Sequence, residues 1–495
     1  MKPKSKKSIL PGILDIYTAA AKSNDGNRCM ISPSPQVKEQ IKKELKQLKG
    51  IAQSGLVSNL LGVKQKTRLG LNDGLIYPGR VFPLGTSISG VRAHERNLVP
   101  AKGVLRVVVV LVEFSDKKLS LSKKQYSDLF FSKGVVPTGS VNEYYAEVTN
   151  GAVDIQGEVA GPFKLPKKLS AYAHNDSGIG DTLPNARTMA RDAAVAANPS
   201  IDFSKYDNDQ DGYVDAFIVI HAGRGAEETG SKSDIWSHKW LIPEEYDADG
   251  TKIYAYLTVP EDCKLGVCAH ELGHLLFGFP DLYDSDYSSE GVGDWCLMGG
   301  GSWNNTGLTP AHPSAWCKKQ QDWVTVINQS VNQKAVVIDD VKKSQQVFRL
   351  WKDGGPGNEY FLIENRQQKN YDKFLPGGGL LVWHIDDNIE ENDNERHYKV
   401  GLVQADGQQD LESGNNRGDT GDSWPGSAGK KSISGKTTPG TLSYGGLETN
   451  VQIQNIKLTS GVVTADLYVS PGAIKPPKKK KPKKKKKPVK KVARR

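Results

Sequence analysis

The longest apolar run of the chain lies in residues 104–114 and reads Val-Leu-Arg-Val-Val-Val-Val-Leu-Val-Glu-Phe. A nearly continuous run of β-branched residues is typical of a central strand that is buried on both faces. Shorter apolar runs and helical spacings follow it as far as about residue 330, and this mixture predicts an α+β or α/β domain. The expected helices are 142–148, 181–197 and 266–277, and the expected further strands are 153–159, 214–221, 253–257 and a short one at Trp236.

The pattern changes in residues 331–470, where short alternating segments are separated by Gly, Asn and Asp. Seven such segments predict a β-sandwich-like domain. They are 335–338, 347–351, 360–364, 380–385, 399–404, 451–456 and 462–469.

Residues 1–100 resemble an appendage rather than a domain. Val37, Ile41, Leu45 and Leu48 recur at helical spacing among lysines and predict one amphipathic helix over residues 36–49. The Pro- and Gly-punctuated chain after it predicts irregular structure lying over the larger domain. At the other end, residues 471–495 are rich in Lys and Pro and predict a disordered tail.

Charge is distributed unevenly along the 495 residues. The formal net charge of +10 includes 14 Lys and Arg in the last 25 residues, so the rest of the chain carries −4. The first 70 residues hold 14 Lys and Arg against four acids, which leaves residues 71–470 with −14. An acidic body of this kind favours cation sites over specific nucleic-acid binding. The basic tail can contact polyanions or a cell surface without sequence readout.

Neither end nor middle contains the roughly 18 to 20 uninterrupted apolar residues of a transmembrane segment. The Lys-rich start is typical of a secretory leader, but Pro11, Gly12 and Asp15 interrupt the apolar region that should follow. The chain therefore has either an atypical export signal or an intracellular location.

Four of the five cysteines lie in one window, and their pairing cannot be derived from sequence. Local disulfides Cys263–Cys268 and Cys296–Cys317 are our hypothesis, and they would indicate an oxidising compartment. The spacing of Cys263 and Cys268 excludes a zinc ribbon, which needs C-x2-C.

The segment Cys268-Ala-His-Glu-Leu-Gly-His274 carries the clearest chemistry. On a helix, His270 and His274 project from one face and can bind one metal ion, while Glu271 lies beside it as a candidate general base. Gly278 gives the helix a reason to end there.

The turn after Gly278 can return Asp281 as a third zinc ligand, with Asp284 as the alternative. Met298 lies in Trp-Cys-Leu-Met-Gly-Gly-Gly, which predicts the methionine turn that lies beneath the metal in metzincins. For the oxyanion, no spacing rule selects among Tyr283, Tyr287 and His312.

These motifs resemble the immune inhibitor A family of secreted bacterial metallopeptidases. The resemblance covers roughly residues 30–470 and implies an N-terminal pro-segment (1–100), a metzincin-type zinc endopeptidase domain (101–330) and C-terminal β structure (331–470). It departs from the usual pattern in one place, since Gly278 follows His274 by four residues instead of three. The segments that carry it are His270–Asp284, 295–298, 312–316, 71–78, 207–215, 235–238, 364–367 and 375–386.

An acidic loop precedes the predicted strand at 214–221. Its oxygen donors at positions 1, 3, 5 and 9, with Gly212 at position 6, predict the front of a structural calcium site, and an acidic surface turn is the alternative. Ile218 replaces the glutamate of a helix-loop-helix site. The candidate ligands are Asp207, Asp209, Asp211, Tyr213 through its carbonyl, and Asp215.

A second acidic cluster lies in residues 406–422, where a solvated loop and another calcium site are equally consistent with the sequence. Cys29 can cap zinc as a thiolate and hold a precursor latent, and Asp73 could do the same.

The sequence thus predicts a secreted, latent zinc endopeptidase that acts on protein or peptide substrates through Glu271. Two alternatives remain: an inactive relative that binds polyanions through its basic tail, and an intracellular processing peptidase.

Overall fold

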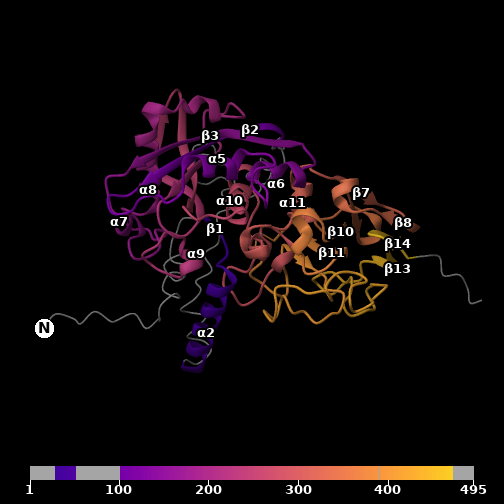
Figure 1. The fold of residues 1–495 in the computed structure, drawn as a ribbon. Coiled ribbons are helices and arrows are strands. Elements are labelled where there is room, and N and C mark those ends of the chain that lie inside the picture. Colours follow the sequence, from indigo (N-terminus) through magenta and orange to yellow (C-terminus); the bar gives the residue numbers. More distant parts are fainter. Residues whose placement is uncertain (1–27, 52–100, 390, 472–495) are drawn as a thin grey trace, which may run out of the picture.

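The computed structural model describes residues 28–51, 101–389 and 391–471 of the chain (Figure 1). A six-stranded mixed sheet forms the first half, in the order β1-β5-β6-β4-β2-β3. Strands β2, β3, β4 and β6 run parallel to one another, and β5 pairs antiparallel with β6. The strands are β1 (Cys29–Met30), β2 (Gly103–Glu113), β3 (Val153–Lys164), β4 (Phe217–His221), β5 (His238–Ala248) and β6 (Thr251–Pro260).

Strand β2 lies inside this sheet, between β3 and β4, as its apolar run predicted. Residues 107–112 are at most 1% exposed because both neighbours are parallel strands and both faces are covered. The α+β class is therefore confirmed for this half of the chain.

Most of the helices of residues 101–330 lie around the sheet (Figure 1). Helix α8 begins at Ala186 rather than near 181, because the Asn185 side chain accepts from the backbone N–H groups of Arg187 and Thr188 and caps the helix there. Trp236 is also not part of a strand, since β5 begins only at His238. The helices are α5 (Lys123–Phe131), α6 (Val141–Val148), α7 (Leu169–Ala173), α8 (Ala186–Ala197), α9 (Ala226–Thr229), α10 (Leu265–Phe277) and α11 (Ala315–Gln320).

The second half contains a five-stranded sheet, β12-β11-β10-β9-β7, and a three-stranded sheet, β13-β14-β8. All seven strands expected from the sequence are present, and β7 was missed. The short helix α12 (Val341–Ser344) connects β8 to β9. The strands are β7 (Thr325–Gln329), β8 (Gln333–Ile338), β9 (Gln346–Trp351), β10 (Glu359–Arg366), β11 (Gly379–Asp386), β12 (Val400–Leu402), β13 (Gln452–Thr459) and β14 (Val462–Tyr468).

The central strands β10 and β11 of the five-stranded sheet are buried on both faces. Along β10, Tyr360 and Leu362 join the core of the first half, whereas Phe361 and Ile363 join a second core shared with the three-stranded sheet. This alternation follows from the two-residue period of a strand, and it fixes the β structure against the first half of the chain.

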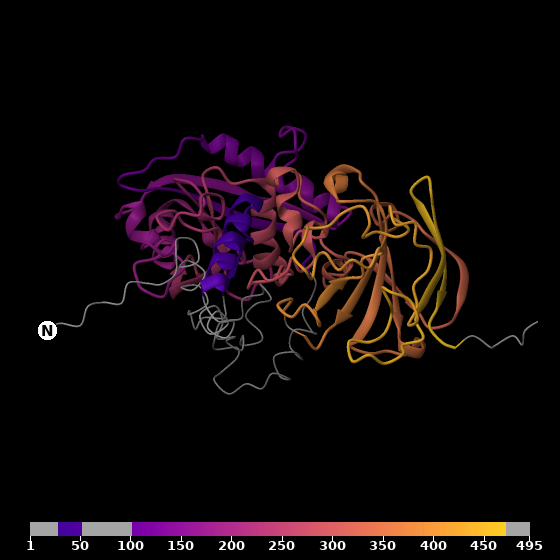
Figure 2. The ribbon, with the colours of Figure 1, turned by 90° about the horizontal axis from the view of Figure 1, so that it is seen from below.

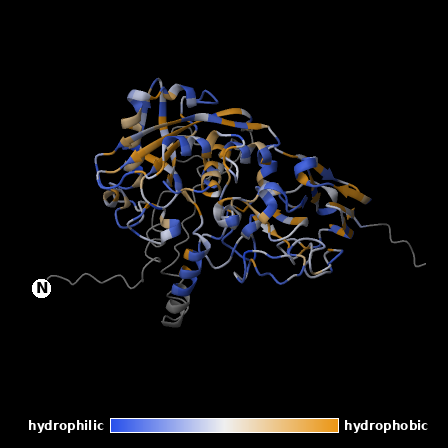
Figure 3. Cartoon of the chain, viewed as in Figure 1, coloured by the Kyte–Doolittle hydropathy of each residue, from blue (hydrophilic) through white to orange (hydrophobic). Residues whose placement is uncertain are grey.

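Helix α2 (Pro35–Ile51) confirms the predicted helix and lies near α9, projecting below the first half in the view of Figure 1; Figure 2 shows it from below. Val37 and Ile41 are buried, while much of the helix is hydrophilic (Figure 3). The leader segment, Asp73 and the Lys-rich tail lie outside the described residues. In the part of the chain that is described, no helix combines the length and apolar character needed to cross a membrane.

Candidate metal centre

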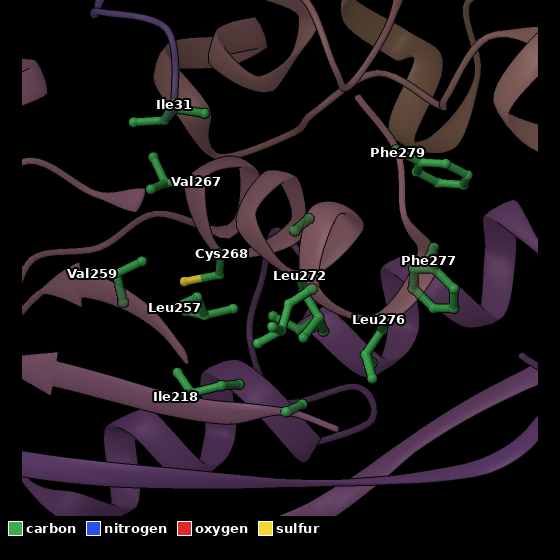
Figure 4. Close-up of a cluster of buried hydrophobic side chains, with 14 of the residues drawn as sticks. Ile31, Ile218, Leu257, Val259, Val267, Cys268, Leu272, Leu276, Phe277 and Phe279 are labelled. Atoms are coloured by element: carbon green, nitrogen blue, oxygen red, sulfur yellow. The ribbon is translucent and has the colours of Figure 1, made fainter. Parts of the chain in front are cut away.

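Helix α10 carries the histidine motif through the centre of the first half. All 13 of its residues are buried, and apolar residues of the sheet and of the N-terminal segment surround it, including Leu257 and Ile31 (Figure 4). The helix ends as predicted at Gly278, whose φ of 65° is favourable for glycine. Its N–H donates to the carbonyls of Gly273 and His274, which closes the last turn.

Three side-chain donors converge at the solvent-side end of this motif. The His270 Nε2 and His274 Nε2 atoms are 3.0 Å apart, and Asp281 Oδ1 lies 3.1 and 3.2 Å from them. Zinc bonds of roughly 2.0–2.1 Å in tetrahedral geometry place ligand atoms about 3.3 Å apart. The three atoms are thus spaced as one zinc ion requires.

Both imidazoles are held with Nε2 toward the shared point. The Nδ1 atoms of His270 and His274 lie at hydrogen-bond distance from the carbonyls of Leu297 and Phe279, an arrangement that fixes the ring orientation of metal-binding histidines. Burial lowers the pKa of His274, and the charge of Asp281 opposes that effect. Burial alone would raise the pKa of Asp281, but the imidazoles, His274 foremost, hold it at about 2.

The Glu271 carboxylate is fully buried, and neither oxygen has a hydrogen-bond partner of normal geometry among the described residues. Burial raises its pKa well above the usual value, and the charge of Asp281 adds to the rise. The backbone of Ile31 approaches this carboxylate and slightly opposes the rise. A buried carboxyl group without partners, next to three potential metal ligands, is typical of an acid-base group.

Met298 lies directly beneath the motif. A Cβ atom placed on Gly273, between the two histidines, would meet the Met298 Sδ atom at 3.0 Å. The Met298 carbonyl accepts from the N–H of Leu282, next to Asp281. The predicted methionine turn is thus in contact with both the helix and the segment that carries Asp281.

The alternative ligand Asp284 does not join this group. Its buried carboxylate accepts hydrogen bonds from Ser288 and from the backbone of Asp286 and Ser289. Among the oxyanion candidates, the Tyr283 ring stacks near His270, with centroids 6.5 Å apart.

The other two candidates for that role differ in their surroundings. Tyr287 stacks on Tyr283, also with centroids 6.5 Å apart. His312 contacts Glu147, with 2.9 Å between Nε2 and Oε1. None of the three is thereby assigned to the oxyanion.

The N-terminal segment runs along this site. Strand β1 pairs antiparallel with the outer strand β5, opposite Lys239 and His238. The Cys29 Sγ atom lies within 4.8 Å of ligand atoms of both His274 and Asp281. The predicted thiol is therefore close to the metal-binding atoms.

Side chains of the first half hold the backbone that follows Cys29. Hydroxyl and indole groups donate to three consecutive carbonyls: Tyr283 to Met30 at 2.6 Å, Trp236 to Ile31 at 2.9 Å and Trp303 to Ser32 at 2.8 Å. Sequence reasoning missed these donors, because a tryptophan in the sequence does not reveal which backbone its N–H will meet.

Helix α2 is anchored by ion pairs that the sequence also did not predict. Lys38 and Lys42 place their Nζ atoms 2.6 Å from the two carboxylate oxygens of Glu290. Glu290 is 2% exposed, and Lys38 is buried as well. Burial lowers the pKa of Lys38, while Glu290 opposes that effect.

The structure brings some of the predicted calcium ligands close together. Ligand atoms of Asp207, Asp209 and Asp215 lie within 4.8 Å of one another. Burial raises the pKa of Asp215 to about 7. The Asp211 carboxylate is not part of this group, and its Oδ1 accepts from the Tyr213 N–H. The Tyr213 carbonyl stays a predicted ligand.

The predicted disulfides are not formed, and all five cysteines are free thiols. The proposed partners are nevertheless neighbours, since Cys263 hydrogen-bonds to Cys268 and Cys296 to Cys317. The sequence hypothesis was therefore right about proximity and wrong about the covalent bond.

The histidine motif and the carboxylates beside it are arranged as is typical of metallopeptidases. Residues 101–328 match the family described as "Immune inhibitor A peptidase M6, catalytic domain". The chain is 29% identical over 266 residues to "Pre-pro-metalloprotease PrtV" of Vibrio cholerae, covering 46% of this chain and 29% of that protein. It is 31% identical over 259 residues to "Immune inhibitor A" of Bacillus thuringiensis, covering 41% of this chain and 38% of that protein.

Proposed function

We propose that the chain is a secreted, metzincin-type zinc endopeptidase in which His270, His274 and Asp281 bind zinc and Glu271 is the general base. The observation that carries the proposal is the convergence of the three donor atoms within 3.2 Å. They lie beside the buried Glu271 carboxylate, whose oxygens have no hydrogen-bond partner of normal geometry among the described residues. Names of relatives that include metalloprotease support it. The two-sheet core of the second half is consistent with the predicted sandwich.

Bound zinc supplies a water of lowered pKa and polarises the scissile carbonyl. Glu271 takes the water proton and passes it to the leaving amine. Its raised pKa makes Glu271 a stronger proton acceptor than an ordinary carboxylate. The backbone carbonyls of Leu297 and Phe279 keep the imidazoles oriented throughout.

The N-terminal segment, residues 28–51, supports latency of the unprocessed chain. Strand β1 adds to the edge of the sheet, which is how many proteins bind extended peptides. It thereby takes the place that a substrate would occupy next to Glu271. We propose that Cys29 is the fourth zinc ligand in this state and that removal of residues 28–51 frees the site.

The test is hydrolysis of casein by the full chain and by Glu271→Gln, before and after limited proteolysis of the N-terminal segment. We expect cleavage only by the processed wild type, and loss of it on chelation. Removal of such a base typically costs on the order of 10² to 10⁴ in rate. Glu412→Gln is the matched control, because it changes a half-buried glutamate away from the site whose partner Gln404 can still donate to it.

Equal activity of Glu271→Gln and wild type would refute the assigned base. Inactivity of both with no bound zinc would instead support the alternative of an inactive protein that binds polyanions through its basic tail. Full activity of the unprocessed chain would refute latency alone.

A further inference from the structure

Three carboxylates of the second half meet outside the candidate metal centre. Ligand atoms of Asp406, Asp419 and Asp422 lie within 4.8 Å of one another, at the edge of the loop 403–427. None of the described lysine or arginine side chains forms an ion pair with them. Three negative charges at this separation repel one another strongly unless a cation or protons compensate them.

One member of the cluster, Asp422, is buried and its hydrogen bonding is incomplete. Asp422 is 1% exposed. Its Oδ2 atom accepts from the Trp295 indole at 2.9 Å and from the Asp419 backbone at 3.0 Å. Its Oδ1 atom is buried and has no partner in the described part of the chain. An orphaned buried carboxylate oxygen is costly, and a missing ion is one of the standard explanations.

The carboxylates of Asp406 and Asp419 lie close to the backbone of Gly421. A Cβ atom added to Gly421 would meet Asp406 Oδ2 at 2.2 Å and Asp419 Oδ1 at 2.9 Å, so glycine is what allows these side chains to fold over residue 421. Burial raises the pKa of Asp422 to about 7, and the charges of Asp419 and Asp406 add to the rise.

We propose that Asp406, Asp419 and Asp422 bind a divalent cation of the calcium class. All three potential ligands are carboxylates. Hard cations such as calcium prefer oxygen ligands, whereas zinc is commonly bound by nitrogen and sulfur. Waters complete the six to eight oxygens that calcium takes.

The site also joins the two halves of the chain. Trp295, which donates to Asp422, directly precedes the segment that ends at Met298. The adjacent Asp294 forms an ion pair with Arg417 at 3.0 Å, and its N–H donates to the Arg417 carbonyl. A cation here therefore stabilises the packing of the loop 403–427 against the support of the metal centre.

The experiment uses terbium luminescence, because Trp295 lies next to the cluster and can transfer energy to a bound Tb³⁺ ion. We expect tryptophan-sensitised emission in the full chain, displaced by calcium and at least tenfold weaker in Asp422→Asn. Asp209→Asn, which alters the other acidic loop, should keep the emission. Calcium should also raise the melting temperature of Asp209→Asn.

Absence of sensitised emission in natively folded wild type would overturn the proposal, as would equal emission from wild type and Asp422→Asn. If Asp422→Asn does not fold, Asp406→Asn serves as the second variant, because Asp406 is only half-buried. Emission lost in Asp209→Asn and kept in Asp406→Asn would assign the ion to the other loop and refute this site.

Discussion

The anchor of helix α2 offers a quantitative prediction, because two lysines share one buried carboxylate. In Glu290→Gln, Lys38 and Lys42 lose the charge that they contact at 2.6 Å, while the shape of the side chain is kept. Lys38 then remains buried without its counter-ion as long as α2 stays docked. The variant should therefore favour release of the N-terminal segment.

The size of the effect follows from the two contacts. A hydrogen bond to a charged group contributes about 1.5–3 kcal/mol, and breaking a buried pair costs about 3–5 kcal/mol. The glutamine oxygen still accepts from one lysine, and undocking lets Lys38 regain water. We therefore expect a loss of about 3 kcal/mol from docking, which is on the order of a hundredfold in the ratio of docked to released chain.

Two measurements check this value. Hydrogen exchange should show faster exchange in residues 35–51 of Glu290→Gln, and the unprocessed variant should cleave a fluorogenic peptide up to a hundredfold faster than unprocessed wild type. After removal of the segment, both chains should have the same activity. Lys124→Met is the control, because it removes an exposed pair with Asp128 whose contribution should be below about 1 kcal/mol.

Unchanged exchange in residues 35–51, together with unchanged latent activity, would refute the idea that this anchor holds the segment in place. Faster exchange without activation would show that the anchor is real but that docking does not block the site.

Three further predictions concern stability. Burial lowers the pKa of His221 from 6.5 to about 4. As the pH drops from 6.5 toward 4, the unfolded chain therefore binds a proton at this histidine before the folded chain does, and the free energy of unfolding falls by about 3 kcal/mol in total. Urea unfolding of His221→Gln should show a smaller decrease over the same pH range. Arg366→Met removes the guanidinium that donates to the fully buried Asp372 at 2.7 Å. It should lower the free energy of unfolding by about 3–5 kcal/mol. A decrease below about 1 kcal/mol would contradict the buried pair. Calcium should raise the melting temperature of wild type by more than that of Asp209→Asn, and equal shifts would argue against a cation in the loop 207–215.

The sequence predicted those parts of the site that are local. His270, Glu271 and His274 share one helical turn, and Gly278 ends the helix, so a short stretch contains all the information needed. Asp281 was harder, because the additional residue before Gly278 left its position open until the turn was seen.

The contacts of the N-terminal segment could not be predicted, because they join distant parts of the chain. Lys38 and Glu290 are 252 residues apart. A two-residue strand such as β1 has no periodicity to reveal it, and its pairing with β5 depends on an edge that exists only after the sheet has formed. The seven strands of the second half were found because each one lies in a short segment rich in apolar residues, and Gly, Asn and Asp separate these segments.

The most direct test of the central claim is X-ray absorption at the zinc edge of the unprocessed, zinc-loaded chain. The account predicts one zinc per chain with two imidazole nitrogens, one carboxylate oxygen and one sulfur at about 2.3 Å. Cys29→Ala should lose the sulfur and keep the imidazoles, whereas Cys263→Ala should keep both. A zinc shell without two imidazoles, or a chain that binds no zinc, would contradict the metal centre; a shell with the imidazoles but no sulfur would contradict the role of Cys29.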